Sequence, residues 1–322
     1  MSAVRTLHVD PDEDGMRLDR WFRKHHPELT HGRLEKLLRT GQVRVDGGRV
    51  KASTRLAAGQ AVRIPPLDAA PKPPAAAFAP SAEDARDIAG MTLYEDERIL
   101  VLDKPPGLAS QGGSGITRHL DGMLAALTDR KGNRPRLVHR LDRETSGVIV
   151  VAKTRLAAAE LSASFRTRRV QKLYWGLAVG VPEMRQGMIR VPLKRIGVGG
   201  EDKMVPAGKD EGQHAVTRYA VLATAGKRAA FIAMEPVTGR THQLRAHMAA
   251  IGTPLLGDTR YGAEESPLGP GLPKGLHLHA RRLRLPGEGG PITVTAPLPR
   301  HMAESWAFFG FDPEADNGEF DA

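Results

Sequence analysis

The stretch His139–Arg140–Leu141–Asp142–Arg143–Glu144–Thr145–Ser146–Gly147 runs directly into the apolar segment Val148–Ala152. The apolar segment predicts a buried strand, and the polar residues before it predict a turn at its start. Asp142 lies between two arginines, so we expect its carboxylate to have a lowered pKa and to stay ionised near neutral pH. Such an anion can act as a nucleophile, a base or a charge stabiliser, but an ion-paired surface turn would have the same pattern.

The pattern on both sides of this strand predicts the fold class. Between Met91 and about Trp306, strands and helices alternate irregularly. Adjacent strands without regular intervening helices favour an α+β domain with a mixed, mostly antiparallel sheet. The predicted strands are Ile99–Leu102, Val148–Ala152, Leu173–Val179, Val216–Leu222 and Ala230–Met234, and the predicted helices are Arg118–Leu127, Ala157–Thr167 and His242–Ile251.

Residues 16–64 predict a second, smaller unit. A helix is expected at Leu18–His25 and another from Thr30 to Gly41, which are suitable residues to begin and end a helix. The pair Asp46–Gly47 is a strong signal for a hairpin turn, and Ala61–Ile64 fits a last strand.

Most of the chain's positive charge lies in this small unit. The whole chain has a formal charge of +10, and the segment from Gly15 to Ile64 holds twelve Lys/Arg against four Asp/Glu, a net +8. A concentrated basic patch predicts a polyanionic partner. Nucleic acid fits better than a membrane surface, because the segment has no exposed apolar face to insert.

The remaining segments are predicted to be connecting or terminal. Residues 65–86 hold six Pro and eight Ala and predict a semi-extended linker. The main domain is expected to span residues 91–305. Residues 306–322 are expected to form an acidic, disordered tail, because five acids and no base follow from Asp312 onward.

Composition excludes several classes of protein. The chain has no cysteine, which excludes disulfides and thiolate chemistry and fits a reducing cytoplasm. No apolar run reaches the roughly 18–20 residues that span a bilayer, and the N-terminus does not resemble a signal peptide. We therefore expect a cytoplasmic protein without a membrane anchor.

Two further segments carry residues suited to a functional site. Gly239–Arg240–Thr241–His242–Gln243–Leu244–Arg245–Ala246–His247 joins a predicted strand to a predicted helix, whose N-terminus favours anions. His242 and His247 do not have the i, i+4 spacing of a helical metal pair, so no metal site is expected. Lys172–Leu173–Tyr174–Trp175–Gly176 is by itself an ordinary strand with an aromatic pair.

Taken together, these segments resemble the RluA class of pseudouridine synthases. Arg136 to Gly147 resembles the signature of the class, and the other matching segments follow in the order of the family. Residues 16–64 resemble the αL RNA-binding module, which was first described in a small-subunit ribosomal protein. This module, together with Gln111–Gly112–Gly113–Ser114–Gly115, resembles the RluC branch, which modifies large-subunit (23S-type) ribosomal RNA. The matching segments are Lys104–Pro105–Pro106–Gly107, Lys172-x-Tyr174, Gly239 to His247, Gly257–Asp258-x-x-Tyr261–Gly262 and Leu278–His279–Ala280.

The resemblance implies a role for individual residues. Asp142 would be the nucleophile, Arg245 would pair with it, and Tyr174 would pack on the target base and could move a proton from C5. The substrate-binding residues would be Arg140, which fills the space left by the flipped base, Leu244, which forms an apolar wall, His139 and Gln243. Because the reaction is an isomerisation, the resemblance implies no cofactor and no metal.

Five basic residues of the small unit are candidates for contacts with RNA phosphates. Each could instead be an ordinary solvated charge. The modular layout is compatible with a monomer. The five candidates are Arg17, Arg33, Lys36, Arg39 and Lys51.

Two other functions would use the same charge distribution. A non-catalytic RNA-binding or ribosome-assembly factor would require Asp142 to be dispensable. A metal-dependent nuclease would require clustered acidic ligands, whereas the signature segment surrounds Asp142 with arginines.

Overall fold

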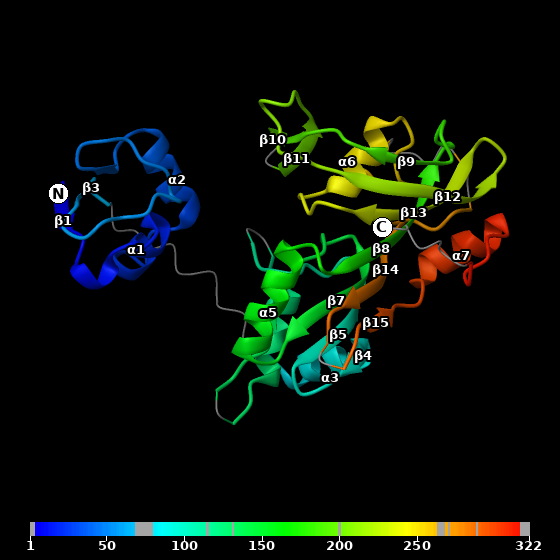
Figure 1. Cartoon of the computed structure of the whole chain (residues 1–322), viewed down its shortest axis with the longest axis horizontal. Coiled ribbons are helices and arrows are strands. Elements are labelled where there is room, and N and C mark those ends of the chain that lie inside the picture. The colour runs from blue at the N-terminus through cyan, green and yellow to red at the C-terminus, as the bar shows by residue number, and fades with distance from the viewer. Residues whose placement is uncertain are drawn as a thin grey trace. The chain divides into compact units, whose positions relative to one another are not determined.

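The computed structural model describes residues 4–67, 80–113, 116–130, 132–198, 201–262, 268–269, 271–287 and 289–315. The chain divides into two compact units, Met1–Ala77 and Phe78–Ala322 (Figure 1). Three predicted segments lie partly outside the described residues. They are the linker at residues 68–79, the segment Gln111–Gly115 at residues 114–115 and the tail at residues 316–322.

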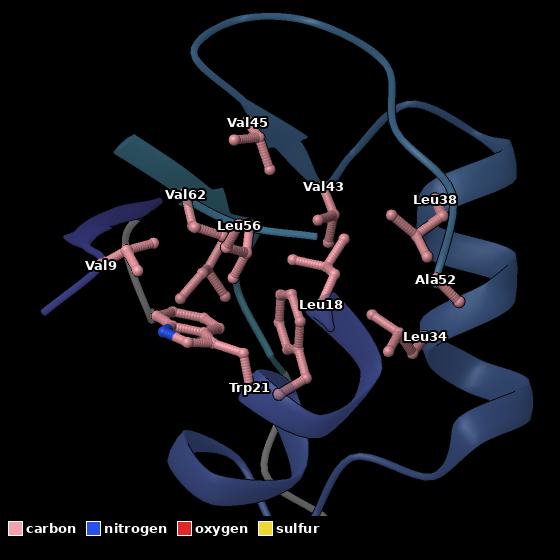
Figure 2. Packing of buried hydrophobic residues seen from close by; sticks show 12 residues of the cluster. Val9, Leu18, Trp21, Leu34, Leu38, Val43, Val45, Ala52, Leu56 and Val62 are labelled. Atoms are coloured by element: carbon pink, nitrogen blue, oxygen red, sulfur yellow. The ribbon is translucent and has the colours of Figure 1, made fainter. Parts of the chain in front are cut away.

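The first unit places two helices against a small antiparallel sheet whose strand order is β1-β3-β2. Apolar residues of α1 and α2 meet those of the sheet in one buried cluster, and Figure 2 shows Leu18, Trp21 and Leu34 pointing into it. The elements are β1 (Arg5–His8), η1 (Pro11–Glu13), α1 (Leu18–His25), α2 (His31–Arg39), β2 (Arg44–Val45) and β3 (Ala61–Ile64).

Two details of this unit differ from the expectation. It begins before residue 16, because β1 pairs with β3 and Val9 belongs to the core. The turn at Asp46–Gly47 is present, with φ of 48° and 74°, but only one bridge, from Val45 to Gly48, follows it, and β2 pairs with β3. The likeness to a two-stranded hairpin therefore holds only for the turn.

The second unit is built on one large sheet in the order β4-β5-β7-β14-β8-β13-β12-β9, with β6 on β7 and β15 on β14. All pairs are antiparallel except β7 with β14, so the predicted α+β fold with a mostly antiparallel sheet is confirmed. The strands of the sheet are β4 (Thr92–Glu95), β5 (Ile99–Lys104), β6 (Arg136–Leu137), β7 (Ser146–Ala152), β8 (Gln171–Val179), β9 (Gln186–Ile189), β12 (Thr217–Ala225), β13 (Ala229–Pro236), β14 (Leu278–Leu285) and β15 (Ile292–Thr295).

Helices cover both faces of this sheet, and a separate hairpin joins β10 to β11. Strand β7 is apolar from Val148 to Ala152 because both of its faces are buried. Val148 and Val150 pack with α5, whereas Ile149 and Val151 pack with α3 and α4. The remaining elements are α3 (Ala82–Met91), α4 (Leu120–Met123), η2 (Leu124–Leu127), α5 (Arg155–Arg166), β10 (Leu193–Val198), β11 (Glu201–Pro206), α6 (Gln243–Ala250) and α7 (Arg300–Phe309).

The main domain begins before the predicted residue 91 and ends after the predicted residue 305. Helix α3 begins at Ala82, inside the predicted linker, because Ser81 caps it and Asp84 completes a capping box. Helix α7 continues to Phe309, and Trp306 and Phe311 are buried against Phe231 of β13. The segment predicted as a tail thus starts inside the core. Within the described part of the chain, no helix is long and apolar enough to cross a membrane.

Candidate active site

The loop that carries Asp142 is held by the segment 104–110. Ser110 Oγ donates to the carbonyl of Leu141 at 2.6 Å and accepts the N–H of the same residue at 3.1 Å. The N–H of Gly107 donates to the carbonyl of Arg143 at 2.9 Å. Lys104 is fully buried, and its ammonium donates to the carbonyls of Pro105, Leu108 and Arg143. The backbone on both sides of Asp142 is therefore tied to this segment.

Burial of the Lys104 ammonium is only partly compensated. Desolvation lowers the pKa of Lys104 to about 8, although the charges of Glu144 and Asp142 act in the opposite direction. The short segment Lys104–Gly107 thus supports the loop that carries Asp142.

Gly147 allows β7 to approach β14 closely. Its φ is 105°, and a Cβ atom at this position would lie 2.2 Å from the carbonyl oxygen of Ala280. Only glycine fits both the backbone conformation and this space. The parallel contact between Gly147 and Ala280 sets where the loop that carries Asp142 leaves the sheet.

The start of α6 brings two cationic or titratable side chains to Asp142. His242 Nε2 lies 3.8 Å and Arg245 Nη1 lies 3.9 Å from the same oxygen, Oδ2 of Asp142. The Asp142 side chain is 21% exposed, so it faces open space on its other side. The predicted proximity of Arg245 and Asp142 is therefore present, but at a distance longer than a hydrogen bond.

Arg245 has a tighter partner that the sequence did not indicate. Asp258 is buried and accepts two hydrogen bonds from the Arg245 guanidinium, from Nε at 2.8 Å and from Nη2 at 2.7 Å. Burial alone would lower the pKa of Arg245, but the carboxylates of Asp258 and Asp142 raise the pKa above its ordinary value. Arg245 thus stays charged, with Nη1 left to face Asp142.

The turn from Gly257 to Gly262, which we call the bracket, holds His242 and Arg245, the two side chains that lie beside the Asp142 carboxylate. Asp258 Oδ1 also accepts the N–H groups of Arg260 and Tyr261 at 3.1 Å. The Tyr261 hydroxyl lies 3.0 Å from His242 Nδ1, and its ring lies under the Arg245 guanidinium. The two glycines are needed, because a Cβ at Gly257 would lie 1.8 Å from the carbonyl oxygen of Gly275 and one at Gly262 would lie 2.9 Å from that of Asp258.

These side chains open onto a pocket of about 790 Å³. This volume is in the range of small-molecule and nucleotide sites. Its wall combines Asp142 and Arg140 from the catalytic loop with Tyr174 of β8 and with Leu244 and Arg245 of α6. The predicted catalytic residues therefore come together at one pocket.

The sequence matches known proteins in agreement with this arrangement. A family model described as RNA pseudouridylate synthase matches residues 98–250. The chain is 35% identical over 302 residues to the ribosomal large subunit pseudouridine synthase C of Vibrio vulnificus, covering 92% of this chain and 94% of that protein. The chain belongs to the RNA pseudouridylate synthase family. The predicted resemblance to this class is confirmed, and membership makes the chain an RNA-modifying isomerase.

Further relatives agree with this assignment. The Escherichia coli protein of the same name is 36% identical over 306 residues, covering 92% of this chain and 93% of that protein. Among solved structures, human RNA pseudouridylate synthase domain containing 4 is 30% identical, with a TM-score of 0.57 over 70% of this chain and 95% of that chain. The family model ends before Asp258 and Tyr261, so the bracket lies just beyond the matched residues.

Within this pocket, Tyr174 and Leu244 lie in the wall. Burial, with a smaller effect of the Asp142 charge, raises the pKa of the Tyr174 phenol well above its ordinary value. A phenol with a raised pKa is a poor base at neutral pH. The raised pKa therefore favours packing against a base over proton transfer for Tyr174.

His139 and Gln243 serve the protein itself more than a substrate. His139 lines the pocket, but its Nε2 accepts the N–H of Val150 at 2.9 Å and its ring stacks on Phe165. Burial lowers the pKa of His139 to about 3, so the ring is neutral. The bond from Val150 to Nε2 thus fixes the loop that carries Asp142 to β7, and the substrate-binding role of His139 stays a prediction.

Gln243 is buried, and the chain occupies every hydrogen-bonding position of its amide. Nε2 donates to the carbonyl of Val216 and to Thr217 Oγ1, and Oε1 accepts from Thr238 Oγ1 and from the N–H of Arg240. The amide therefore has no donor left for a substrate, although Gln243 lines the pocket, and its substrate-binding role stays a prediction. Gln243 positions the loop before α6.

The basic candidates of the first unit are exposed but not equivalent. Arg33, Lys36, Arg39 and Lys51 are exposed, and among the described residues no acidic side chain pairs with Lys36, Arg39 or Lys51. Arg17 forms a two-point ion pair with Asp19, with nitrogen–oxygen distances of 3.1 and 2.6 Å. Its charge is already neutralised, which weakens the prediction of a phosphate contact for Arg17.

Proposed function

We propose that this chain converts specific uridines of large-subunit ribosomal RNA to pseudouridine, with Asp142 as the nucleophile. The observation that carries the proposal is the position of Asp142 at the pocket, with Arg245 and His242 beside one carboxylate oxygen. The names of the Vibrio and Escherichia coli relatives, each matched over most of its length, support the ribosomal large subunit as the source of the substrate.

The chemistry asks little beyond what the pocket offers. The bond from N1 to C1′ of the ribose breaks, the base turns, and a bond from C5 to C1′ forms, while C5 loses its proton and N1 gains one. Atoms and electrons balance without a cosubstrate. A carboxylate can assist by adding to the base or to the ribose. In this proposal Arg245 faces the Asp142 carboxylate, and Tyr174 and Leu244 hold the base.

The uridine must leave its stack to reach Asp142, which costs a few kcal/mol. Arg140 is exposed at the rim of the pocket, where its guanidinium lies 3.4 Å from Thr241 Oγ1. This position supports the role of Arg140 in filling the vacated space. The first unit would supply phosphate contacts through Lys36, Arg39, Lys51 and Arg33.

The proposal includes a cytoplasmic monomer that works without metal or cofactor. The modular layout of the chain is compatible with a monomer. Isomerisation consumes no second substrate, which removes the chemical need for a cofactor. A synthase of this kind should be indifferent to EDTA, unlike a metal-dependent nuclease.

The test is tritium release from 5-tritiated uridine in ribosomal RNA. We expect the wild-type protein to release tritium from large-subunit fragments or intact RNA, and Asp142→Asn to lose at least about 10³-fold in rate while its RNA affinity changes less than about twofold. No release by the wild type on any substrate would favour a non-catalytic binding factor. Parallel loss of affinity and turnover in the variant would contradict the assignment of Asp142.

A further inference from the structure

Two nitrogen atoms approach Oδ2 of Asp142, but neither closes a hydrogen bond. His242 Nε2 lies at 3.8 Å and Arg245 Nη1 at 3.9 Å. Hydrogen bonds of catalytic groups are often long before substrate binds and shorten afterwards. Arg245 is accounted for by its pair with Asp258, which leaves the purpose of His242 open.

The surroundings of His242 determine which of its ring nitrogens carries hydrogen. The N–H of Met204 in β11 donates to the Tyr261 oxygen at 2.8 Å, so this oxygen already acts as an acceptor. The Tyr261 O–H is then free to donate to His242 Nδ1, 3.0 Å away. With Nδ1 as acceptor, the neutral imidazole must carry its hydrogen on Nε2, the atom that faces Asp142.

Burial and two neighbouring arginines favour the neutral form of the His242 ring. Burial lowers the pKa of His242, and the positive charges of Arg245 and Arg260 lower it further. Asp142 and Asp258 act in the opposite direction but do not outweigh burial. Near neutral pH the ring is therefore a neutral hydrogen-bond donor.

The backbone of His242 is strained in a way that serves this orientation. Its φ and ψ are 49° and 23°, in the left-handed region that few residues other than glycine adopt. It occupies the N-cap of α6, yet its side chain forms no cap hydrogen bond. Strain of this kind persists where the surrounding structure requires one arrangement of a side chain.

We propose that His242 is a positioning residue for Asp142, with its Nε2–H directed at Oδ2 because Tyr261 fixes the tautomer. This inference rests on the proposed role of Asp142 as the nucleophile. One neutral donor on Oδ2 orients the carboxylate and leaves Oδ1 for the attack on the uridine. Contacts connect β11 to Asp142 through Tyr261 and His242. The bracket therefore acts on Asp142 through two side chains, His242, which Tyr261 holds, and Arg245, which Asp258 holds.

The kinetic test uses Tyr261→Phe, which removes one oxygen atom and keeps the ring beneath Arg245. We expect the single-turnover rate on ribosomal RNA to fall about tenfold, with KM within twofold of the wild type. Tyr219→Phe is the matched control, because its hydroxyl also donates one hydrogen bond, to the carbonyl of Met184, but away from the pocket. This control should keep the wild-type rate. Equal rates for Tyr261→Phe and the wild type would overturn the proposal.

A second pair of variants tests whether the side chain at position 242 must be long enough to donate a hydrogen bond to Asp142. In His242→Gln, the side-chain amide can donate from about the position of Nε2, so we expect part of the rate to be retained. His242→Asn accepts the left-handed backbone equally well but is too short, so we expect the tenfold loss. A lower rate for His242→Gln than for His242→Asn would contradict a donor role.

Nitrogen NMR of the imidazole rings tests the tautomer without any activity. We expect the His242 signals, identified by their loss in His242→Gln, to show hydrogen on Nε2 and none on Nδ1, and the two tautomers to mix in Tyr261→Phe. A wild-type ring with hydrogen on Nδ1 would overturn the proposal. Because this readout needs no substrate, failure of the proposed ribosomal substrate would leave it unaffected.

Discussion

Each unit contains a fully buried carboxylate, and the two carboxylates differ in whether one of their hydrogen-bond partners also faces a pocket. In the first unit, Glu13 accepts from the Trp21 indole at 2.7 Å, from Lys24 at 2.6 Å and from His25 at 2.7 Å. In the second unit, Asp258 accepts two bonds from Arg245 and two from the backbone of its own turn. Both satisfy the rule that buried charge must be paired.

The partners of Glu13 lie within the same small unit, so its ion pairs only hold α1 against η1. Arg245, in contrast, uses two nitrogens for Asp258 and presents a third to Asp142. A buried ion pair therefore marks a functional site when one member has a donor left over that faces a pocket. Burial and pairing alone do not distinguish the two cases.

The largest effect in this comparison is expected for Asp258→Asn. The substitution removes the charge opposite a buried guanidinium, a change that costs about 3–5 kcal/mol in other proteins. Without its carboxylate partner, Arg245 is expected to leave Asp142, and we predict at least a 100-fold lower single-turnover rate. Rates are to be compared at a temperature where circular dichroism shows the variant folded.

Asp84→Asn provides the matched control for this change. Asp84 is also buried and accepts two bonds from one arginine, Arg118, at 3.0 and 2.8 Å, but it caps α3 and does not line the pocket. We expect it to lower the free energy of unfolding without changing the rate of the folded enzyme. If Asp258→Asn and Asp84→Asn had the same rate, the link from Asp258 to catalysis would be lost.

Glu13→Gln is expected to affect stability but not chemistry. Burial would raise the pKa of Glu13, but hydrogen bonds from Lys24, His25 and Trp21 outweigh it and hold the pKa at about 2, against 4.5 when unfolded. A lowered folded pKa contributes stability that is present above pH 4.5 and is lost as pH falls from 4.5 towards 2.

The variant should therefore be less stable than the wild type by about 2 kcal/mol at neutral pH, and the difference should shrink on acidification. The measurement is acid unfolding of the full chain, followed by the NMR signal of the Trp21 indole N–H. The turnover rate at neutral pH should not change. A stability difference that is constant from pH 7 to pH 2 would contradict the role of Glu13.

The sequence predicted those parts of the molecule that depend on local pattern. The range of α1 was predicted residue for residue, and the core of β7 was recognised because an apolar run needs only its own neighbours in the sequence. The gathering of Asp142, Tyr174 and Arg245 came from the resemblance and not from periodicity. Contacts between distant segments had no local signal, and the pair of Arg245 with Asp258 is one of these.

The features that the sequence did not reveal have the same physical origin. His139 and Gln243 look like free polar side chains in the sequence, but β7 and the residues around Val216 use their hydrogen-bonding atoms. The predicted linker was read from its Pro and Ala content, although the cap at Ser81 was visible within it. A capping pattern inside a low-complexity segment is the signal that could have corrected this boundary.

The smallest effect is expected on the surface of the first unit. There, basic side chains without an acidic partner among the described residues can be compared with Arg17, which pairs with Asp19. Replacing both Lys36 and Arg39 by Gln removes two exposed charges that have no acidic partner among the described residues. If both contact phosphates, RNA affinity at physiological salt should fall about 3- to 10-fold, and the slope of log K against log salt should become shallower by about 1.5. Turnover at saturating RNA should not change.

Arg17→Gln is the counterpart, because Asp19 already neutralises this guanidinium. We expect it to leave the salt slope within about 0.3 of the wild type, since a charge paired within the protein releases few counterions from RNA. Binding titrations of the full chain at several salt concentrations separate the two variants. An equal loss for Arg17→Gln would mean that the ion pair opens on binding, whereas no loss for the double variant would move the phosphate contacts away from α2.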